Sequence, residues 1–148
     1  MVGVVLVSHG SMAQGTLEAA SMIVGTQVGI ATVTLREGDN VEGLIECVAA
    51  AINEVDEGNG VLVLVDLFGA SPFNASARLA MERDGIEVIT GMSLPMLVEM
   101  MVHREGATLA ELVAITREAG VQGVRTLSET LGGRADSGED TTQPGRGC

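Results

Sequence analysis

The sequence contains a histidine and an aspartate that each follow an apolar segment. His9 comes shortly after the run Val2–Val7, and Asp66 directly ends the run Val61–Val65. Histidine is a competent nucleophile near neutral pH, and a carboxylate bonded to one ring nitrogen fixes the tautomer so that the other presents its lone pair. If the two runs are neighbouring strands, the pair is suited to accept a chemical group.

The turns after this pair favour a negatively charged group. They hold two serines, each predicted as the N-cap of a helix whose unpaired N–H groups and positive dipole end would face the pair. They also hold three small residues that let the backbone approach a ligand closely. We therefore expect a phosphate-binding site. Its residues are Gly10, Ser11, Gly69, Ala70 and Ser71.

Other roles for these residues compete with this one. Taken alone, a histidine at a strand end is commonly a satisfied polar residue, and an aspartate before a turn is commonly a turn former. A hydrolase built on Ser71 would want a Gly-x-Ser-x-Gly turn, which the sequence lacks. A metal site would need a third ligand beside His9 and Asp66, so we expect no metal and no cofactor. A phospho-accepting aspartate of the receiver type would want a lysine, and the chain has none.

Strand and helix patterns alternate along the chain. The predicted strands are Val2–Val7, Val28–Leu35, Val61–Val65 and Glu87–Thr90. Helical spacing predicts helices that begin near Ser11, Val41, Ser71, Ser93 and Thr108. This alternation is typical of an α/β fold with an open, mainly parallel sheet and helices on both faces. In the strand order 2-1-3-4, the histidine and the aspartate would face each other where the chain order reverses.

Composition narrows the class of protein. The 148 residues suit one domain, and a formal charge of -12 disfavours binding to nucleic acid or to an anionic membrane. All eight cations are arginine, which excludes a P-loop lysine and a Schiff-base lysine. Two cysteines without metal or redox spacing, and no apolar run near the roughly 18 residues of a membrane span, predict a cytoplasmic protein. We also predict that the side chains of Cys47 and Met81 are buried in the core.

The C-terminal part changes character. The apolar residues of the segment Val121–Leu127 fit neither the helical nor the strand period well, and we predict this segment as a last strand. From Gly132 the residues are mostly Gly, Ser, Asp, Thr and Arg, without an apolar anchor. We therefore predict one domain over 1–131 and a disordered tail or linker over 132–148.

Three segments carry a resemblance to a known family. They are Val5–Gly10 (VLVSHG), Gly60–Asn74 (GVLVLVDLFGASPFN) and Gly91–Leu97 (GMSLPML). In order and spacing they resemble the IIA domain of the mannose-type (mannose/fructose/sorbose) family of the bacterial phosphoenolpyruvate-dependent sugar phosphotransferase system, over residues 1 to about 130. Two positions depart from that family, which commonly has Trp where Phe68 stands and a second Gly where Ala70 stands.

The resemblance implies a function and a set of partners. His9 would accept a phosphoryl group from the carrier protein HPr and pass it to a IIB component for sugar uptake, while Asp66 orients the ring. The family also implies a cytoplasmic homodimer whose last strand is exchanged and lies antiparallel at the partner's sheet edge. Contact with the membrane would be indirect, through the IIC/IID permease.

Two other functions remain open on the sequence. One is a regulatory phosphoprotein of the same fold, in which phosphorylation of His9 controls partner binding; the absence of IIB, IIC and IID partners would favour it. The other is a small hydrolase that uses His9 and Asp66, which steady turnover of phosphate esters without a donor protein would support.

Overall fold

The computed structural model describes residues 1–132, which form four strands and six helices. The strands are β1 (Gly3–His9), β2 (Ile30–Leu35), β3 (Val61–Val65) and β4 (Ile86–Ile89). The helices are α1 (Met12–Val24), α2 (Val41–Val55), α3 (Ser71–Glu82), α4 (Leu94–His103), α5 (Leu109–Gln122) and α6 (Leu127–Gly132). The alternation of strands and helices is the one that the apolar spacing predicts.

The strands form one parallel sheet in the order β2-β1-β3-β4, which confirms the predicted fold class. Val7 of β1 lies opposite Val33 of β2 and Val65 of β3. The central strands β1 and β3 are buried on both faces, which is why both are continuous apolar runs. Because all strands run the same way, their carboxyl ends share one edge, and the chain order reverses there between β1 and β3.

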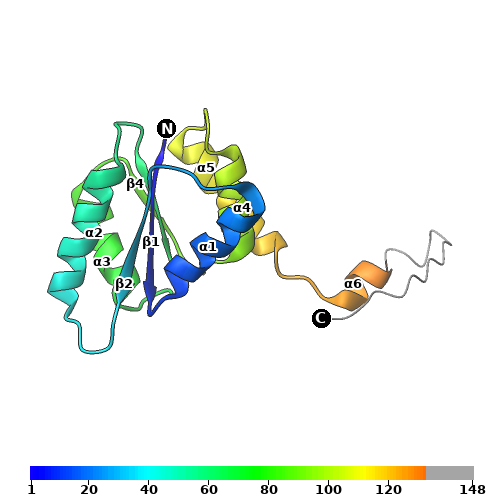
Figure 1. Ribbon diagram of the computed structural model, residues 1–148, viewed down its shortest axis with the longest axis horizontal. Helices are drawn as coiled ribbons and strands as arrows, with labels where there is room; N and C mark the ends of the chain where they lie inside the picture. Colours follow the sequence, from blue (N-terminus) through cyan, green and yellow to red (C-terminus); the bar gives the residue numbers. More distant parts are fainter. Residues whose placement is uncertain (133–148) are drawn as a thin grey trace.

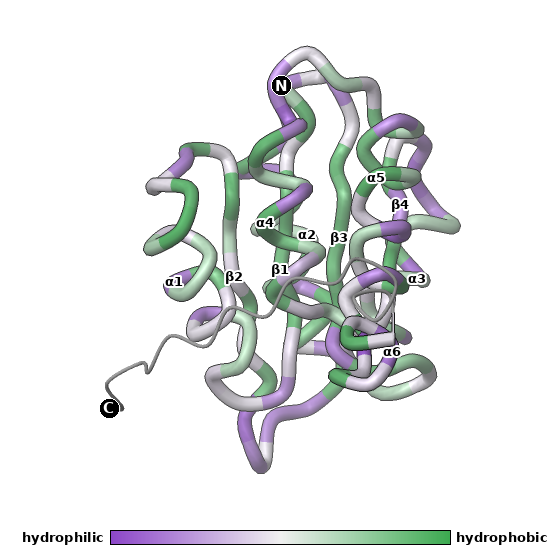
Figure 2. The backbone as a smooth tube through the Cα atoms, turned by 90° about the vertical axis from the view of Figure 1, so that its right-hand side faces the viewer, coloured by the Kyte–Doolittle hydropathy of each residue, from purple (hydrophilic) through white to green (hydrophobic). Residues whose placement is uncertain are grey.

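Helices cover both faces of the sheet (Figure 1). α2 and α3 lie on one face, and α1, α4 and α5 lie on the other. In Figure 2 most residues of β1 and β3 are coloured as apolar, whereas polar and apolar residues alternate along the helices. This alternation is expected when each helix turns one side inward.

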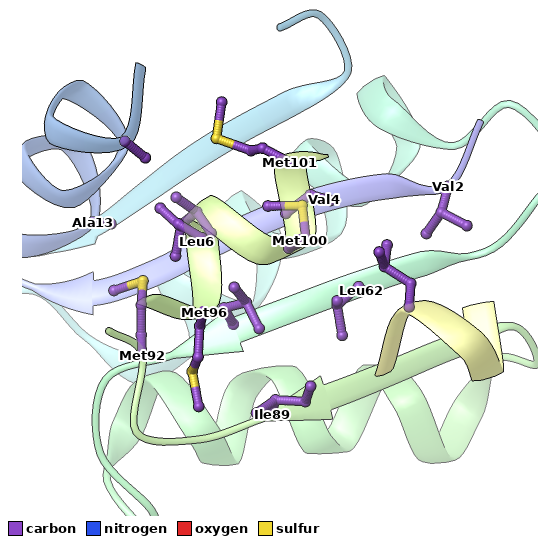
Figure 3. Close-up of a cluster of buried hydrophobic side chains, with 14 residues drawn as sticks. Val2, Val4, Leu6, Ala13, Leu62, Ile89, Met92, Met96, Met100 and Met101 are labelled. Carbon is purple, nitrogen blue, oxygen red and sulfur yellow. The ribbon is translucent and has the colours of Figure 1, made fainter. Parts of the chain in front are cut away.

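The two faces are packed with different side chains. Under α2 and α3 the core consists of Val, Leu, Ile and Ala residues. The opposite core holds four methionines from α4 and the loop before it, which lie over β1 and β3 in Figure 3. These methionines are Met92, Met96, Met100 and Met101. Methionine is unbranched and fills irregular gaps, so this face can adapt its packing more readily than the other.

A buried arginine holds the sheet together at the edge opposite the carboxyl ends. Arg104 follows α4 and is 1% exposed. Its Nε donates to the carbonyl of Val2 at 2.7 Å, and its two terminal nitrogens donate to those of Val28 at 2.7 Å and Gly29 at 2.6 Å. Gly29 has a φ of 70°, and an added Cβ would lie 2.6 Å from the guanidinium. Burial lowers the pKa of Arg104, opposed by the charge of Glu57.

The predicted strand at Val121–Leu127 is wrong for this chain on its own. Val121 and Gln122 end α5, and Leu127 begins α6. A single strand leaves its backbone groups unpaired unless a sheet edge lies beside it, whereas a helix pairs its own. α6 lies apart from the sheet in Figure 1 and buries none of its residues. The tail predicted over 132–148 falls, apart from Gly132, outside the described residues.

Two predictions of burial are also wrong. Cys47 is exposed on α2, and Met81 is 82% exposed on α3. α3 instead buries Ala75, Ser76 and Leu79, and Ala75 and Leu79 pack in the core between α2 and the sheet. Within residues 1–132, no helix is long and apolar enough to cross a membrane.

Candidate functional site

The predicted contact between His9 and Asp66 is present at the carboxyl edge of the sheet. Nδ1 of His9 lies 2.8 Å from Oδ2 of Asp66, although the residues are 57 positions apart in the chain. The same oxygen accepts a hydrogen bond from the backbone N–H of His9 at 2.8 Å, and Oδ1 accepts one from Leu67 at 2.9 Å. The pairing of β1 with β3 brings the two residues together.

The carboxylate of Asp66 is held in its charged form. Burial raises its pKa, but the hydrogen bonds from the His9 backbone and ring, the charge of His9 and the backbone N–H of Leu67 outweigh that effect. The net result is a pKa below its usual range. An ionised Asp66 accepts hydrogen bonds only, so Nδ1 of His9 carries the proton and Nε2 presents its lone pair.

The two side chains differ strongly in exposure. The side chain of Asp66 is 10% exposed, whereas that of His9 is 51% exposed. The imidazole of His9 is therefore half open to solvent, while the carboxylate that contacts it is largely protected. Among residues 1–132, no three His, Cys, Asp or Glu side chains gather as they would around a metal ion.

The helix after His9 is capped by a different serine from the one predicted. Ser11 stands at the N-cap position of α1, but its side chain makes no cap hydrogen bond. The buried Ser8 of β1 accepts the backbone N–H of Ala13 at 2.8 Å instead. The Ser11 hydroxyl is thus not used for capping and is available to a ligand. Sequence reasoning missed Ser8, whose signal is a lone hydroxyl in an otherwise apolar strand.

The helix after Asp66 begins one residue earlier than predicted. Ala70 is the N-cap of α3, so Ser71 is its first residue and Pro72 its second, and the prediction of Ser71 as cap is wrong. The extended backbone of Ala70 (ψ 175°) places the start of the helix there. Ser71 still lies in the first turn, where unpaired N–H groups face outward.

The loop between β3 and α3 has a defined shape. Gly69 has a φ of 78°, which a glycine adopts without strain, and its carbonyl accepts the side-chain amide of Asn74 at 3.2 Å. The ring of Phe68 packs on that of Phe73, with their centres 4.7 Å apart. Gly10 makes the corresponding turn after β1, with a φ of 55°. A Cβ at Gly10 or Gly69 would meet nothing within 4 Å, so the space beside both turns is open.

Comparison with known proteins places the chain among phosphotransferase-system components. The family model EIIA-man, described as the PTS system fructose IIA component, matches residues 3–116. The chain is 39% identical over 127 residues to the mannose-specific EIIAB component of Escherichia coli (strain K12), and the match covers 85% of this chain but 39% of that protein.

Relatives of similar length also match. The fructose-specific EIIA component of Bacillus subtilis (strain 168) is 29% identical over 143 residues, which cover 97% of this chain and 98% of the relative. Among solved structures, the mannose/sorbose specific IIA subunit from Enterococcus faecalis is similar with a TM-score of 0.78 and 32% identity, over 85% of this chain and 94% of that one.

Proposed function

The chain belongs to the EIIA-man family of phosphotransferase-system IIA components, and we propose that it carries a phosphoryl group on His9 in the cytoplasm, between HPr and a IIB component. Its relatives are IIA components of the mannose, fructose and sorbose type. The observation that carries the proposal is the 2.8 Å contact between Nδ1 of His9 and Asp66, with the ring half exposed.

The transfer is a displacement at phosphorus. The Nε2 lone pair of His9 forms the new P–N bond, and the P–N bond of the donor phosphohistidine breaks with its electrons returning to the donor ring. Nδ1 keeps its proton, and the resulting positive charge on the His9 ring lies against the Asp66 carboxylate. Positioning and charge stabilisation are the main needs of phosphoryl transfer.

The small residues around His9 hold the transferred group in this proposal. The turns at Gly10 and Gly69 leave open space beside the ring. The N–H groups of the first turns of α1 and α3 donate to the phosphoryl oxygens, since the positive dipole ends of helices favour anions. The hydroxyls of Ser11 and Ser71 add donors, because the Ser11 hydroxyl makes no cap hydrogen bond and Ser71 lies inside α3 rather than at its cap. Ala70 keeps the approach free of a large side chain.

The test is phosphorylation of the purified protein with phosphoenolpyruvate, Enzyme I and HPr, followed by intact mass and by stability in mild acid. We expect an acid-labile gain of one phosphoryl group in the wild type and none in His9→Ala. The chain supplies a matched control, because its other histidine, His103, is similarly exposed on α4. His103→Ala should take up the group as the wild type does.

Two results would contradict the carrier function. One is no gain of mass with a donor system that phosphorylates another IIA component. The other is a gain that persists in His9→Ala. Slow transfer onward to a IIB component, with normal uptake from HPr, would keep His9 as the acceptor and favour the regulatory alternative.

We also propose that the chain forms a homodimer through its C-terminal segment. Val121, Val124 and Leu127 are 61%, 85% and 74% exposed within residues 1–132, and a row of exposed apolar side chains is typical of a surface that a partner covers. β4 is a short strand at the edge of the sheet, where a strand from a second chain could pair. Light scattering should give twice the monomer mass for the wild type. The double variant Val124→Ser, Leu127→Ser should have the monomer mass. A double variant that is still a dimer would show that this segment is not part of the interface.

A further inference from the structure

An arginine lies beside the candidate site, on the side of β1 away from Asp66. Arg36 is the residue directly after β2, and the last pair in the register of β1 with β2 is His9 opposite Leu35. The N–H of Gly10 donates to the carbonyl of Leu35 at 2.9 Å, so the two segments stay side by side beyond that pair. Arg36 therefore stands next to the turn that follows His9, and Figure 1 shows the β2–α2 loop at this end of the sheet.

The backbone of Arg36 is held in a turn, while its side chain is exposed. The N–H of Arg36 donates to Oδ2 of Asp39 at 2.8 Å, and its carbonyl accepts the N–H of Asp39 at 3.1 Å. Gly38 completes this turn with a φ of 88°, which a glycine adopts without strain. The turn therefore presents the arginine side chain from a defined point beside the site.

No carboxylate of the described residues neutralises the guanidinium of Arg36. Within residues 1–132, its side-chain nitrogens form no ion pair, whereas Asp39 accepts the backbone N–H of Arg36 and Asp66 accepts His9. Glu37, the next residue in the chain, is exposed. A guanidinium carries five N–H donors in a planar fork that matches the oxygens of a phosphate group. This one is available to an anion at the carboxyl edge.

The orientation of the His9 ring favours contact with Arg36. Nδ1 of His9 faces Asp66, which follows β3, so Nε2 is turned away from β3, and β2 lies on the other side of β1. Neighbouring strands are about 4.8 Å apart. The long side chain of an arginine after β2 can therefore reach a group bound to Nε2.

We propose that Arg36 binds the phosphoryl group on His9 through its guanidinium, both during transfer and in the phosphorylated protein. This inference rests on the proposed function of His9. Nε2 of His9 forms the new P–N bond while the P–N bond of the donor breaks, and Arg36 neither gives nor takes a proton. Its positive charge offsets the negative charge of the phosphoryl group, about −1.5 to −2.

The main test measures the equilibrium between phosphorylated HPr and the chain. A residue that only binds HPr changes the forward and reverse rates by the same factor, whereas a residue that binds the phosphoryl group also shifts the equilibrium constant. In Arg36→Gln we expect the constant for phosphorylation of the chain to fall about fivefold. Intact mass of both proteins after mixing gives this constant.

A small donor gives a second readout. Phosphoramidate transfers a phosphoryl group and needs no docking surface, so Arg36→Gln should slow phosphorylation by phosphoramidate as well as by HPr, by roughly tenfold. Arg36→Lys keeps the charge and loses the planar fork, so both measurements should give a smaller effect in this variant.

Arg83→Gln is the matched control, because it removes the same charge at a distance from His9. Arg83 is exposed and follows the last residue of α3, a helix that begins at the carboxyl edge and runs away from it. Its equilibrium constant and its rates with both donors should equal those of the wild type. Far-ultraviolet circular dichroism checks that each variant is folded.

The outcomes separate the inference from the proposed function. An equilibrium constant in Arg36→Gln equal to that of the wild type would overturn the inference, whether or not KM for HPr rises, while the carrier function stands. A loss of the same size in Arg83→Gln would show a general effect of charge and would also overturn it. If the wild type takes up the phosphoryl group from neither donor, the proposed function itself fails.

Discussion

The His9–Asp66 pair combines a half-exposed imidazole with a largely buried carboxylate. Asp66 binds both the ring and the backbone of His9, so the histidine is fixed at two points. A half-exposed side chain would otherwise sample several rotamers, and holding it reduces the entropy lost when a partner docks. We therefore expect Asp66 to act as a positioning residue for His9.

At this scale the decisive variant is Asp66→Asn, which keeps the shape of the side chain and removes its charge. Hydrogen bonds to charged groups contribute about 1.5–3 kcal/mol, so we expect phosphoryl uptake from HPr to slow by roughly 10- to 100-fold. Rapid-quench measurement of the uptake rate checks this. Uptake at the wild-type rate would show that the carboxylate does not assist the ring.

The lowered pKa of Asp66 also predicts a pH dependence of stability. A carboxyl whose pKa is lower in the folded state stabilises the fold above its unfolded pKa, and the contribution is lost as the pH falls through the folded pKa. The free energy of unfolding of the wild type should exceed that of Asp66→Asn by a constant amount above about pH 5, and the difference should shrink below roughly pH 4. Urea titrations at each pH measure it; a difference that grows in acid would show that the folded state does not favour the charged carboxylate.

Among the elements, α1 depends on the strand before it for its cap. Ser8, buried in β1, accepts the N–H of Ala13, and Ser11 at the cap position does not. Losing a cap acceptor costs about 0.5–2 kcal/mol. Ser8→Ala should therefore lower the free energy of unfolding by about 1–2 kcal/mol, whereas Ser11→Ala should change it by a few tenths. Urea denaturation compares the two; equal losses would return the capping role to Ser11.

The same elements show what the sequence can and cannot predict. The apolar runs and helical spacing predict an open parallel sheet, and in the strand order 2-1-3-4 such a sheet brings His9 and Asp66 together, because parallel strands end at one edge. The cap at Ser8 cannot be predicted in this way, since it depends on which face of β1 the hydroxyl points to. The exposure of Met81 depends on which face α3 turns toward the sheet, and the mixed apolar pattern of this helix does not fix that face. The apolar residues from Val121 to Leu127 are exposed within the described part of the chain, so their pattern alone does not decide between strand and helix.

The molecule as a whole carries a formal charge of -12. A strong negative field speeds encounter with a partner that presents a basic rim, and salt screens it. We expect kcat/KM for phosphorylation by HPr to fall several-fold between about 50 mM and 500 mM salt. Phosphoramidate is an anion, so its reaction should not slow. Salt dependence of the same sign for both donors would indicate a general effect of salt on the site.

The uneven placement of methionine gives the two faces of the sheet different responses to oxidants. Of the eight methionines, four are exposed and four are in the core under α4, whereas the core under α2 and α3 has none. Sulfoxide formation makes a flexible apolar side chain polar. Peroxide would reach Met12, three residues after His9, before it reaches the buried methionines, and would loosen α4 only after the fold opens. Chemical change beside His9 would therefore precede loss of structure as the protein ages.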